Sequence, residues 1–203
     1  MKLYFSPGAC SLASHIALFA SGLAFGSEKV DLRAQPHLTA GGADFSTINP
    51  KGYVPALQLD NGELLTEGVA ILQYIADQAP DKQLAPANGT LARYRLQEWL
   101  NFISTEVHKN FSPIFFGKTE EVKDDAWARL QPRLALLQQQ LEKTPYLQGG
   151  QFSVADAYLF TCLSWAQYVQ RSLADFPALL DYLKRVAVLP ATQQALKAEG
   201  LGQ

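Results

Sequence analysis

The sequence predicts an α+β unit followed by an all-helical unit. Three observations support this fold class. Short strand-like apolar runs alternate with helical patterns over residues 1–79, a stretch rich in proline and polar residues follows at 80–89, and the rest has helical periodicity without a strand signal. We therefore expect a first domain at 1–79, a linker at 80–89 and an all-helical domain at 90–203.

The first domain has the order strand–helix–strand followed by strand–strand–helix. The expected strands are 1–5, 29–32, 54–59 and 63–65, and the expected helices are 10–21 and 66–78. Asp60-Asn61-Gly62 supplies the residue types of a tight hairpin turn between the last two strands. The connection at 33–49 contains glycine and has no regular period, so we expect an irregular segment there.

This order is the connectivity of a thioredoxin-like domain. In such a domain a proline opens the third strand, opposite the start of the first helix, and Pro55 fits that place. Folds of this kind hold that peptide bond cis, so we expect a cis bond between Val54 and Pro55.

The second domain is expected to consist of helices only. The helical segments fall near 90–117, 120–143, 153–171, 176–188 and 190–199. Ser153 to Asp156 has the spacing of a capping box with Asp in place of Glu or Gln, which favours a structural role for Asp156. Cys162 lies in mid-helix between apolar neighbours, and we expect it in the core.

The composition excludes several classes of protein. A net charge of −2 leaves no electrostatic footprint for nucleic acid, and no stretch has the roughly eighteen apolar residues of a membrane span. The chain meets Pro7-Gly8 before any long apolar run, so we expect no signal peptide. Two cysteines do not make a disulfide framework, which indicates a reducing, cytoplasmic location. The histidines are scattered, and we expect no metal site and a hydrogen-bonded structural role for His15.

The segment Ser6–Ser11 places a thiol and a hydroxyl where the first strand turns into a helix. A helix start exposes unpaired N–H groups and a partial positive charge, both of which stabilise a thiolate. The alternative is that Cys10 is a small buried apolar residue and Ser11 a helix cap. Ala13 stands where redox proteins carry a second cysteine, so Cys10 suits an external thiol partner.

A polar stripe runs along the helix expected at 90–117. Asn101, Thr105, His108 and Ser112 share one face, and the apolar residues gather on the opposite side. Such a stripe is usually only a solvated face. Its short hydrogen-bonding side chains, in place of lysine and glutamate, leave a binding role open.

These segments resemble the bacterial beta-class glutathione transferases along essentially the whole chain. The matching stretches are Met1–Tyr4, Ser6–Leu12, Asn49–Gly52, Val54–Leu57, Leu65–Ile71, Glu98–Phe102, Glu106–Lys109 and Ala155–Phe160. The resemblance implies that glutathione binds as a co-substrate in a groove between the domains, without a tightly bound cofactor. It also implies a homodimer.

The resemblance also assigns residues to glutathione. The residue matching Cys10 lies beside the glutathione sulfur and forms a mixed disulfide, the backbone at Val54 pairs with the tripeptide, and Glu67 and Gly68 hold the γ-glutamyl end. The residues so assigned are Cys10, Gln35, Lys51, Val54, Glu67, Gly68, Asn101, Thr105, Glu106, Val107 and His108. A helix cap at the start of the second helix is a compatible second role for Glu67, because both roles use the same N–H groups.

The chain departs from the family pattern at two positions. Relatives often carry a lysine where this chain has Gln35, which forms no ion pair with the glycine carboxylate of glutathione, so Lys51 is the candidate substitute. Relatives often carry a tyrosine at the position of Phe5, and Tyr4 points to the opposite face of the strand, so no catalytic tyrosine is assigned. Glu106 points off the polar stripe and is expected to serve the site of a partner subunit.

The main functional hypothesis is a transferase in which the glutathione thiolate attacks an electrophilic carbon. Cys10, Ser11 and His108 are the expected catalytic residues: the Ser11 hydroxyl stabilises the sulfur charge, and His108 assists by hydrogen bonding or proton removal. The apolar electrophile would meet Phe111, Phe115, Phe116 and Trp165.

Two other functions remain open at this stage. A glutathione-dependent disulfide reductase or peroxidase would use Cys10 as the nucleophile and act on a mixed disulfide. A carrier without catalytic activity would bind glutathione conjugates or apolar ligands. Three results distinguish these functions. Turnover of an electrophile indicates the transferase, turnover of a mixed disulfide indicates the reductase, and tight glutathione binding without turnover indicates the carrier.

Overall fold

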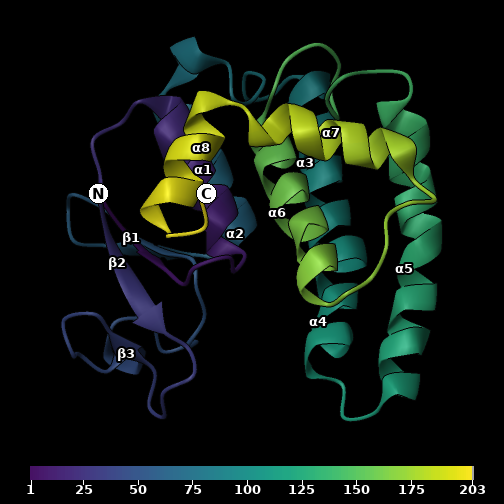
Figure 1. The fold of residues 1–203 in the computed structure, drawn as a ribbon. Helices are drawn as coiled ribbons and strands as arrows, with labels where there is room; N and C mark the ends of the chain where they lie inside the picture. Colours follow the sequence, from purple (N-terminus) through teal and green to yellow (C-terminus); the bar gives the residue numbers. More distant parts are fainter. Residues whose placement is uncertain (203) are drawn as a thin grey trace. The chain divides into compact units, whose positions relative to one another are not determined.

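The structure, a computed structural model, describes residues 1–202 of the chain (Figure 1). Its internal contacts divide the chain into two compact units. The first unit is Met1–Leu84 together with the chain from Pro190 onward, and the second is Ala85–Leu189.

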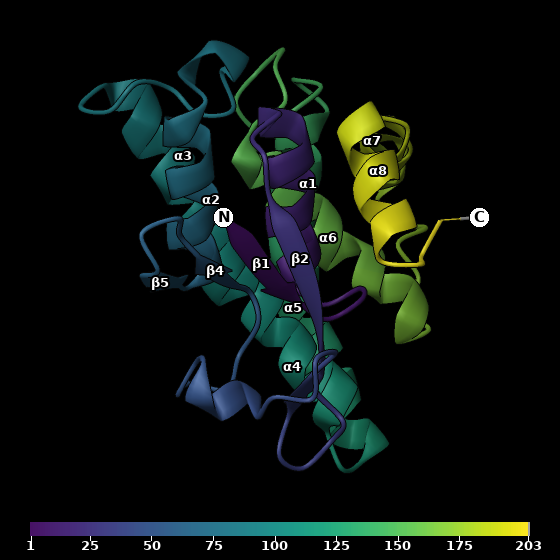
Figure 2. The ribbon, with the colours of Figure 1, turned by 90° about the vertical axis from the view of Figure 1, so that its left-hand side faces the viewer.

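The first unit is built on a mixed five-stranded sheet. Its elements are β1 (Lys2–Phe5), α1 (Ser11–Ser21), β2 (Gly26–Asp31), β3 (Leu38–Thr39), β4 (Ala56–Gln58), β5 (Leu64–Thr66), α2 (Gly68–Gln78) and α8 (Pro190–Ala198), with 3-10 turns at Phe45–Thr47 and Pro80–Lys82. The strand order is β3-β2-β1-β4-β5, in which β1 and β2 are parallel and the other pairs antiparallel (Figure 2). The predicted thioredoxin-like order is therefore confirmed.

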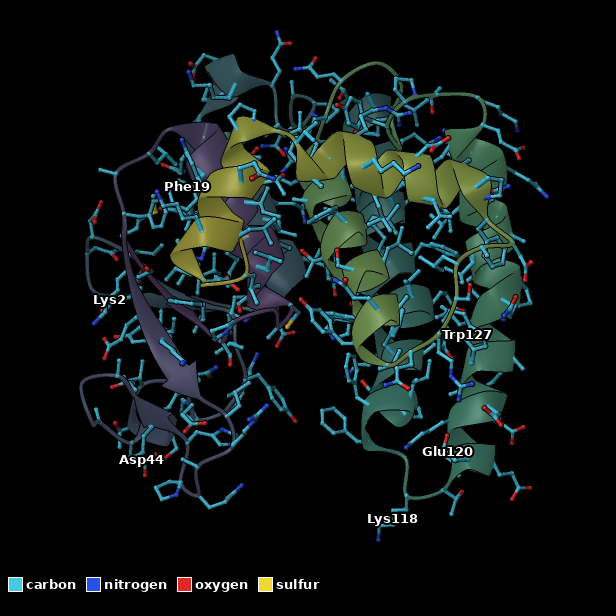
Figure 3. All side chains as sticks on the ribbon, viewed as in Figure 1. Lys2, Phe19, Asp44, Lys118, Glu120 and Trp127 are labelled. Atoms are coloured by element: carbon cyan, nitrogen blue, oxygen red, sulfur yellow. The ribbon has the colours of Figure 1, made fainter. Side chains whose placement is uncertain are left out.

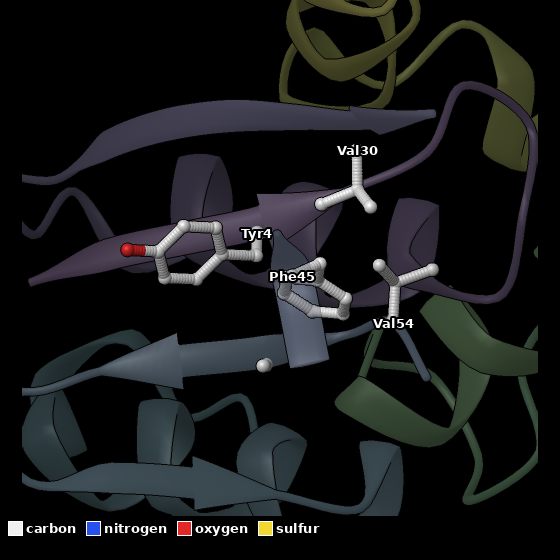
Figure 4. Close-up of a cluster of buried hydrophobic side chains, with 5 residues drawn as sticks. Tyr4, Val30, Phe45 and Val54 are labelled. Atoms are coloured by element: carbon white, nitrogen blue, oxygen red, sulfur yellow. The ribbon is translucent and has the colours of Figure 1, made fainter. Parts of the chain in front are cut away.

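A buried apolar cluster covers one face of this sheet. The cluster consists of Tyr4, Val30, Phe45, Val54 and Ala56 (Figure 4). The ring centroids of Tyr4 and Phe45 lie 5.7 Å apart. Adjacent residues of a strand point to opposite faces, so Phe5 turns away from this cluster and packs against His15 of α1 at 5.0 Å. The cluster anchors Val54 just before β4 begins.

Helix α8 belongs to the first unit by its contacts, because it packs on α1 (Figure 1). The buried carboxylate of Glu199, just after α8, lies 3.0 Å from Nδ1 of His15 and accepts a 2.8 Å hydrogen bond from the N–H of Gly8. This pairing confirms the structural role expected for His15. The division into units differs from the expected 1–79 and 90–203, because two buried polar contacts and the packing on α1 hold the end of the chain to the first unit.

The second unit is helical. It contains α3 (Leu91–Phe102), a π-helical segment (Ile103–His108), α4 (Lys109–Phe116), α5 (Glu120–Leu141), α6 (Val154–Tyr168) and α7 (Pro177–Ala187). Figure 3 marks the start of α5 at Glu120 and the ring of Trp127 on the same helix. The core side of α5 carries Ala126, Leu130, Leu134, Leu137 and Leu141, at the three- and four-residue spacing of one helix face.

Asp156 connects the start of α6 with two other parts of the second unit. The capping box with Ser153 is present, as predicted, through hydrogen bonds from its N–H at 2.9 Å and its hydroxyl at 2.7 Å. The N–H of Leu147 donates to the same carboxylate at 2.9 Å, and the Tyr182 hydroxyl lies 3.3 Å from it. Asp156 therefore has the structural role expected, and Cys162 of α6 is fully buried, as predicted.

Among residues 1–202, no helix combines the length and the apolar character that crossing a membrane requires.

Candidate functional site

The thiol of Cys10 lies at the start of helix α1, where it occupies the N-cap position and is partly exposed. Its Sγ donates a hydrogen bond to the carbonyl oxygen of Val54 at 3.1 Å. The peptide bond from Val54 to Pro55 is cis, which confirms the prediction for this bond. The thiol, the N-terminus of α1 and the backbone edge before β4 therefore meet within the first unit.

The loop before Cys10 is shaped by hydrogen bonds to Ser11. The N–H of Ser6 donates to the Ser11 hydroxyl oxygen at 3.1 Å, and that hydroxyl donates to the Ser6 carbonyl at 3.2 Å. Ser11 is completely buried. Both hydrogen bonds of the Ser11 hydroxyl go to Ser6. The geometry therefore favours a role of Ser11 in holding the loop, in place of the contact with the glutathione sulfur expected from the sequence.

Gly8 gives this loop its turn. Its φ of +72° lies in the left-handed region, which glycine adopts without strain. The N–H of Gly8 is the group that donates to Glu199, so the carboxylate after α8 supports the loop that carries Cys10.

The start of helix α2 holds Glu67 and Gly68, the residues assigned to the γ-glutamyl end, and Lys51, the candidate for the glycine carboxylate, contacts the first of them. Nζ of Lys51 lies 2.7 Å from Oε1 of Glu67 and 3.1 Å from the hydroxyl oxygen of Thr66. Glu67 has φ +67°, a conformation that costs a residue with a side chain about 1–3 kcal/mol and is common at ligand sites. Gly68 follows and lies beside Pro55, where an added Cβ would make an ordinary 3.7 Å contact with the Cγ of that proline.

The ion pair between Lys51 and Glu67 is exposed, and such pairs contribute only about 0–1 kcal/mol. Both side chains therefore remain free to exchange this contact for one with a ligand at little cost. Gln35, the residue in place of the family lysine, is exposed as well.

The polar stripe of the second unit runs through the π-helical segment. The sequence predicted one continuous α-helix over 90–117, whereas the structure interrupts it at Ile103–His108, where the turn is wider. Asn101 and Thr105 are exposed, and the Thr105 hydroxyl donates to the Asn101 carbonyl at 3.1 Å. The side chain of Val107 is fully buried in the core.

His108 ends the π-helical segment and is held by helix α6. Its Nδ1 lies 2.7 Å from the hydroxyl oxygen of Tyr158, and its ring lies 4.8 Å from that of Trp165 between centroids. Burial, and secondarily the positive charge of Lys109, lower the pKa of His108 from 6.5 to about 4. Near pH 7 this imidazole is therefore neutral.

The aromatic residues proposed for the electrophile pocket lie beside His108. The ring of Trp165 lies 5.5 Å from that of Phe111 and 5.8 Å from that of Phe115. Phe111 is fully buried, whereas Phe115 is 39% and Phe116 83% exposed. Phe111 is thus a core residue, and Phe115 and Phe116 are accessible apolar rings.

Glu106 has a partner within its own chain. Its Oε2 accepts hydrogen bonds from Nε of Arg133 on α5 at 2.9 Å and lies 2.8 Å from Nη2 of the same guanidinium. The expected service to a partner subunit would have to share this carboxylate with Arg133.

The structure adds two residues that the sequence reasoning did not single out, Tyr158 and Glu199. Helical periodicity placed Tyr158 in the apolar α6 and gave no signal that pairs it with His108, fifty positions away. Glu199 ends the helix expected at 190–199, and no local pattern pairs it with residues near the start of the chain. Within residues 1–202, no group of three or more His, Cys, Asp or Glu side chains is placed to hold a metal ion.

Comparison with known families gives two matches. Residues 8–78 match the model of the glutathione S-transferase N-terminal domain, and residues 120–185 match that of the glutathione S-transferase C-terminal domain.

Individual relatives cover nearly the whole chain. Glutathione S-transferase GstA of Escherichia coli O157:H7 is 47% identical over 202 residues, which are 99% of this chain and 100% of that protein. The bacterial GST BphK, solved as a ternary complex, is 54% identical with a TM-score of 0.96 and covers 99% of this chain and 100% of its own. The beta-class glutathione S-transferase of Sphingomonas chungbukensis is 50% identical with a TM-score of 0.94, at the same coverage.

Proposed function

Since the chain belongs to the glutathione S-transferase family, we propose that Cys10 and the Val54 backbone receive the sulfur-bearing part of glutathione. The chain is a transferase that conjugates glutathione to electrophilic, apolar compounds. The residues that carry out this reaction are the subject of the proposal.

One observation carries the proposal, the 3.1 Å contact between Sγ of Cys10 and the Val54 carbonyl oxygen. It joins a partly exposed thiol to a backbone edge that lies two residues before the first ladder residue of β4, Ala56. A peptide ligand pairing with that edge as an antiparallel strand brings its own thiol to the N-terminus of α1. The partial positive charge at this helix start favours a thiolate.

In the proposed reaction the glutathione thiolate attacks the electrophilic carbon of the second substrate. A carbon–sulfur bond forms, and in a substitution the leaving group departs with the electron pair of the broken bond. We assign His108 to this reaction on the family resemblance, together with Asn101 and Thr105 as polar contacts of glutathione. Phe115 and Phe116 supply accessible apolar surface for the electrophile, and the buried ring of Trp165 packs behind Phe115.

Each carboxylate of glutathione has a candidate partner in the first unit. The N–H of Gly68 and the carboxylate of Glu67 suit the γ-glutamyl group, whose α-carboxylate and ammonium need a donor and an acceptor. Lys51, now paired with Glu67, is the candidate cation for the glycine carboxylate in place of a lysine at Gln35.

Disulfide exchange through Cys10 is a second candidate reaction, favoured by the partial exposure of this thiol at a helix N-terminus. The Cys10 thiolate attacks the glutathionyl sulfur of a mixed disulfide, forms a protein–glutathione disulfide and releases the other thiolate. A second glutathione thiolate then attacks the glutathionyl sulfur of this adduct, forms glutathione disulfide and restores the Cys10 thiolate.

A Cys10→Ala variant tests both reactions, with Cys162→Ala as the control for a buried thiol. We expect Cys10→Ala to lose the glutathione adduct seen by mass spectrometry and all turnover of a mixed disulfide, because no sulfur remains to be attacked. Conjugation of a chloronitrobenzene should fall about three- to tenfold, since the sulfur loses about one hydrogen-bonding neighbour. An adduct that persists in Cys10→Ala, or conjugation equal to that of the unaltered protein, contradicts the proposal. Tight glutathione binding without either turnover would favour a carrier.

We further propose that the chain works as a homodimer in the cytoplasm. The exposed apolar side chains of Leu91 and Tyr94, 71% and 59% accessible on α3, support an association of two copies. Neither Cys10 nor Cys162 is part of a disulfide, which fits a reducing compartment.

A further inference from the structure

The side chain of His108 has a hydrogen-bonding partner that neither the sequence nor the family comparison assigns to the reaction. Tyr158 is 5% exposed, and its hydroxyl oxygen lies 2.7 Å from Nδ1 of His108. Trp165, two turns along the same helix, packs edge-on against the imidazole at an interplanar angle of 67°. The orientation of His108 is therefore set from α6.

We infer that Tyr158 is a positioning residue: it donates its O–H to Nδ1 of His108 and so leaves the imidazole proton on Nε2. The inference rests on the proposed role of His108. Under it, His108 acts on sulfur or on the leaving group as a hydrogen-bond donor, and proton removal by this side chain is excluded.

The direction of the hydrogen bond follows from the chemistry of the two groups. A neutral imidazole has one N–H donor and one bare nitrogen acceptor, and the bond made by one nitrogen selects the proton position on the other. A phenol O–H is a stronger acid than a neutral imidazole N–H, and a bare imidazole nitrogen is a stronger acceptor than a phenol oxygen. Hence the bond runs from Tyr158 to Nδ1.

The neutral state that this argument needs is supported by the surroundings of His108. Burial and the neighbouring Lys109 both oppose a positive charge on the ring and lower its pKa. A neutral donor aimed at developing negative charge stabilises that charge without holding the substrate thiolate in a tight ion pair.

The first experiment observes the proton directly, by NMR of the full-length protein labelled with ¹⁵N at histidine. In the unaltered protein at neutral pH we expect His108 to carry its proton on Nε2, with Nδ1 as a hydrogen-bonded bare nitrogen. In Tyr158→Phe the Nδ1 resonance should move to the position of an unbonded nitrogen. Tyr168→Phe, which alters a 56% exposed ring on the same helix, is the control and should leave it unmoved. A proton on Nδ1 in the unaltered protein, or an unmoved resonance in Tyr158→Phe, overturns the inference.

The second experiment measures conjugation kinetics in a cycle of variants. Tyr158→Phe should lower kcat about three- to tenfold and leave KM for glutathione within about twofold, because one orienting hydrogen bond is lost. In a His108→Gln background the same change should have no further effect, since Tyr158 acts only through His108. An equal loss in both backgrounds overturns the positioning role. Unchanged kcat in His108→Gln removes His108 from the reaction, and with it the catalytic part of the inference, while the NMR result still decides the direction of the bond.

Discussion

The lowered pKa of His108 makes the stability of this protein depend on pH in a direction that can be worked out in advance. Burial, and then the charge of Lys109, lower this pKa from 6.5 to about 4. Between these values the unfolded chain holds a proton on His108 that the folded chain does not. The contribution of His108 to stability is therefore present above about pH 6.5 and is lost as the pH falls through 4.

The magnitude follows from the same two values. Their difference of about 2.5 pKa units, at about 1.4 kcal/mol for each unit, corresponds to about 3 kcal/mol. The imidazole is only partly shielded from solvent, so about 2–3 kcal/mol is the expected size. Replacing His108 by glutamine removes the titrating group, and with it this part of the pH dependence.

Urea unfolding followed by circular dichroism, from about pH 7 down to about pH 4, measures the effect as a difference between variants. As the pH falls over this range, the free energy of unfolding of His108→Gln should rise by about 2–3 kcal/mol relative to that of the unaltered protein. The lost Tyr158 contact adds only an offset that does not change with pH. Ser112→Ala, which removes no group that titrates there, should run parallel to the unaltered protein. A constant difference between His108→Gln and the unaltered protein across the range would refute the reasoning.

Two further predictions concern the second unit and the assembly. Burial, opposed by hydrogen bonds from Leu147, Ser153 and Tyr182, raises the pKa of Asp156 to about 6, so its contribution is complete below about pH 3.8 and is lost as the pH rises through 6. In urea unfolding, Asp156→Asn should have a lower free energy of unfolding than the unaltered protein, and this difference should shrink by about 2–3 kcal/mol from about pH 4 to pH 7. A difference that grows with pH would contradict this sign. Sedimentation should give twice the mass of one chain, and a combined Leu91→Glu and Tyr94→Glu variant should shift toward single chains; a single-chain mass for the unaltered protein would rule out the dimer.

Local patterns in the sequence were sufficient for most of the fold. The helix expected at 10–21 is observed at Ser11–Ser21, and that expected at 120–143 at Glu120–Leu141. These predictions succeed because helix formation depends on apolar spacing and on end signals within a few residues. The prediction of the second strand is less accurate, since we expect it at 29–32 and observe it at Gly26–Asp31. Pairing with β1 determines where this strand starts.

Long-range contacts were the part that local patterns could not supply. The π-helical turn at Ile103–His108 depends on packing around α3 and α4, and no residue type marks it. The pairing of Glu199 with His15 and Gly8 joins residues more than 180 positions apart. The site shows the same division. The thioredoxin-like connectivity and the family resemblance predicted that Cys10 and Val54 lie together, whereas no pattern in the sequence predicted Tyr158 as the partner of His108.

The return of α8 to the first unit has a consequence for the order in which the protein is made. The carboxylate of Glu199 that contacts Gly8 and His15 lies more than 180 residues after them, so it is synthesised well after the sheet and α1 have left the ribosome. Until then the first unit lacks one of its helices, and the N–H of Gly8 and the buried ring of His15 lack their contact with this carboxylate. The nascent thioredoxin-like unit therefore reaches its final packing only after the residues of α8 and Glu199 have been synthesised, and the loop that bears Cys10 is among the parts fixed late.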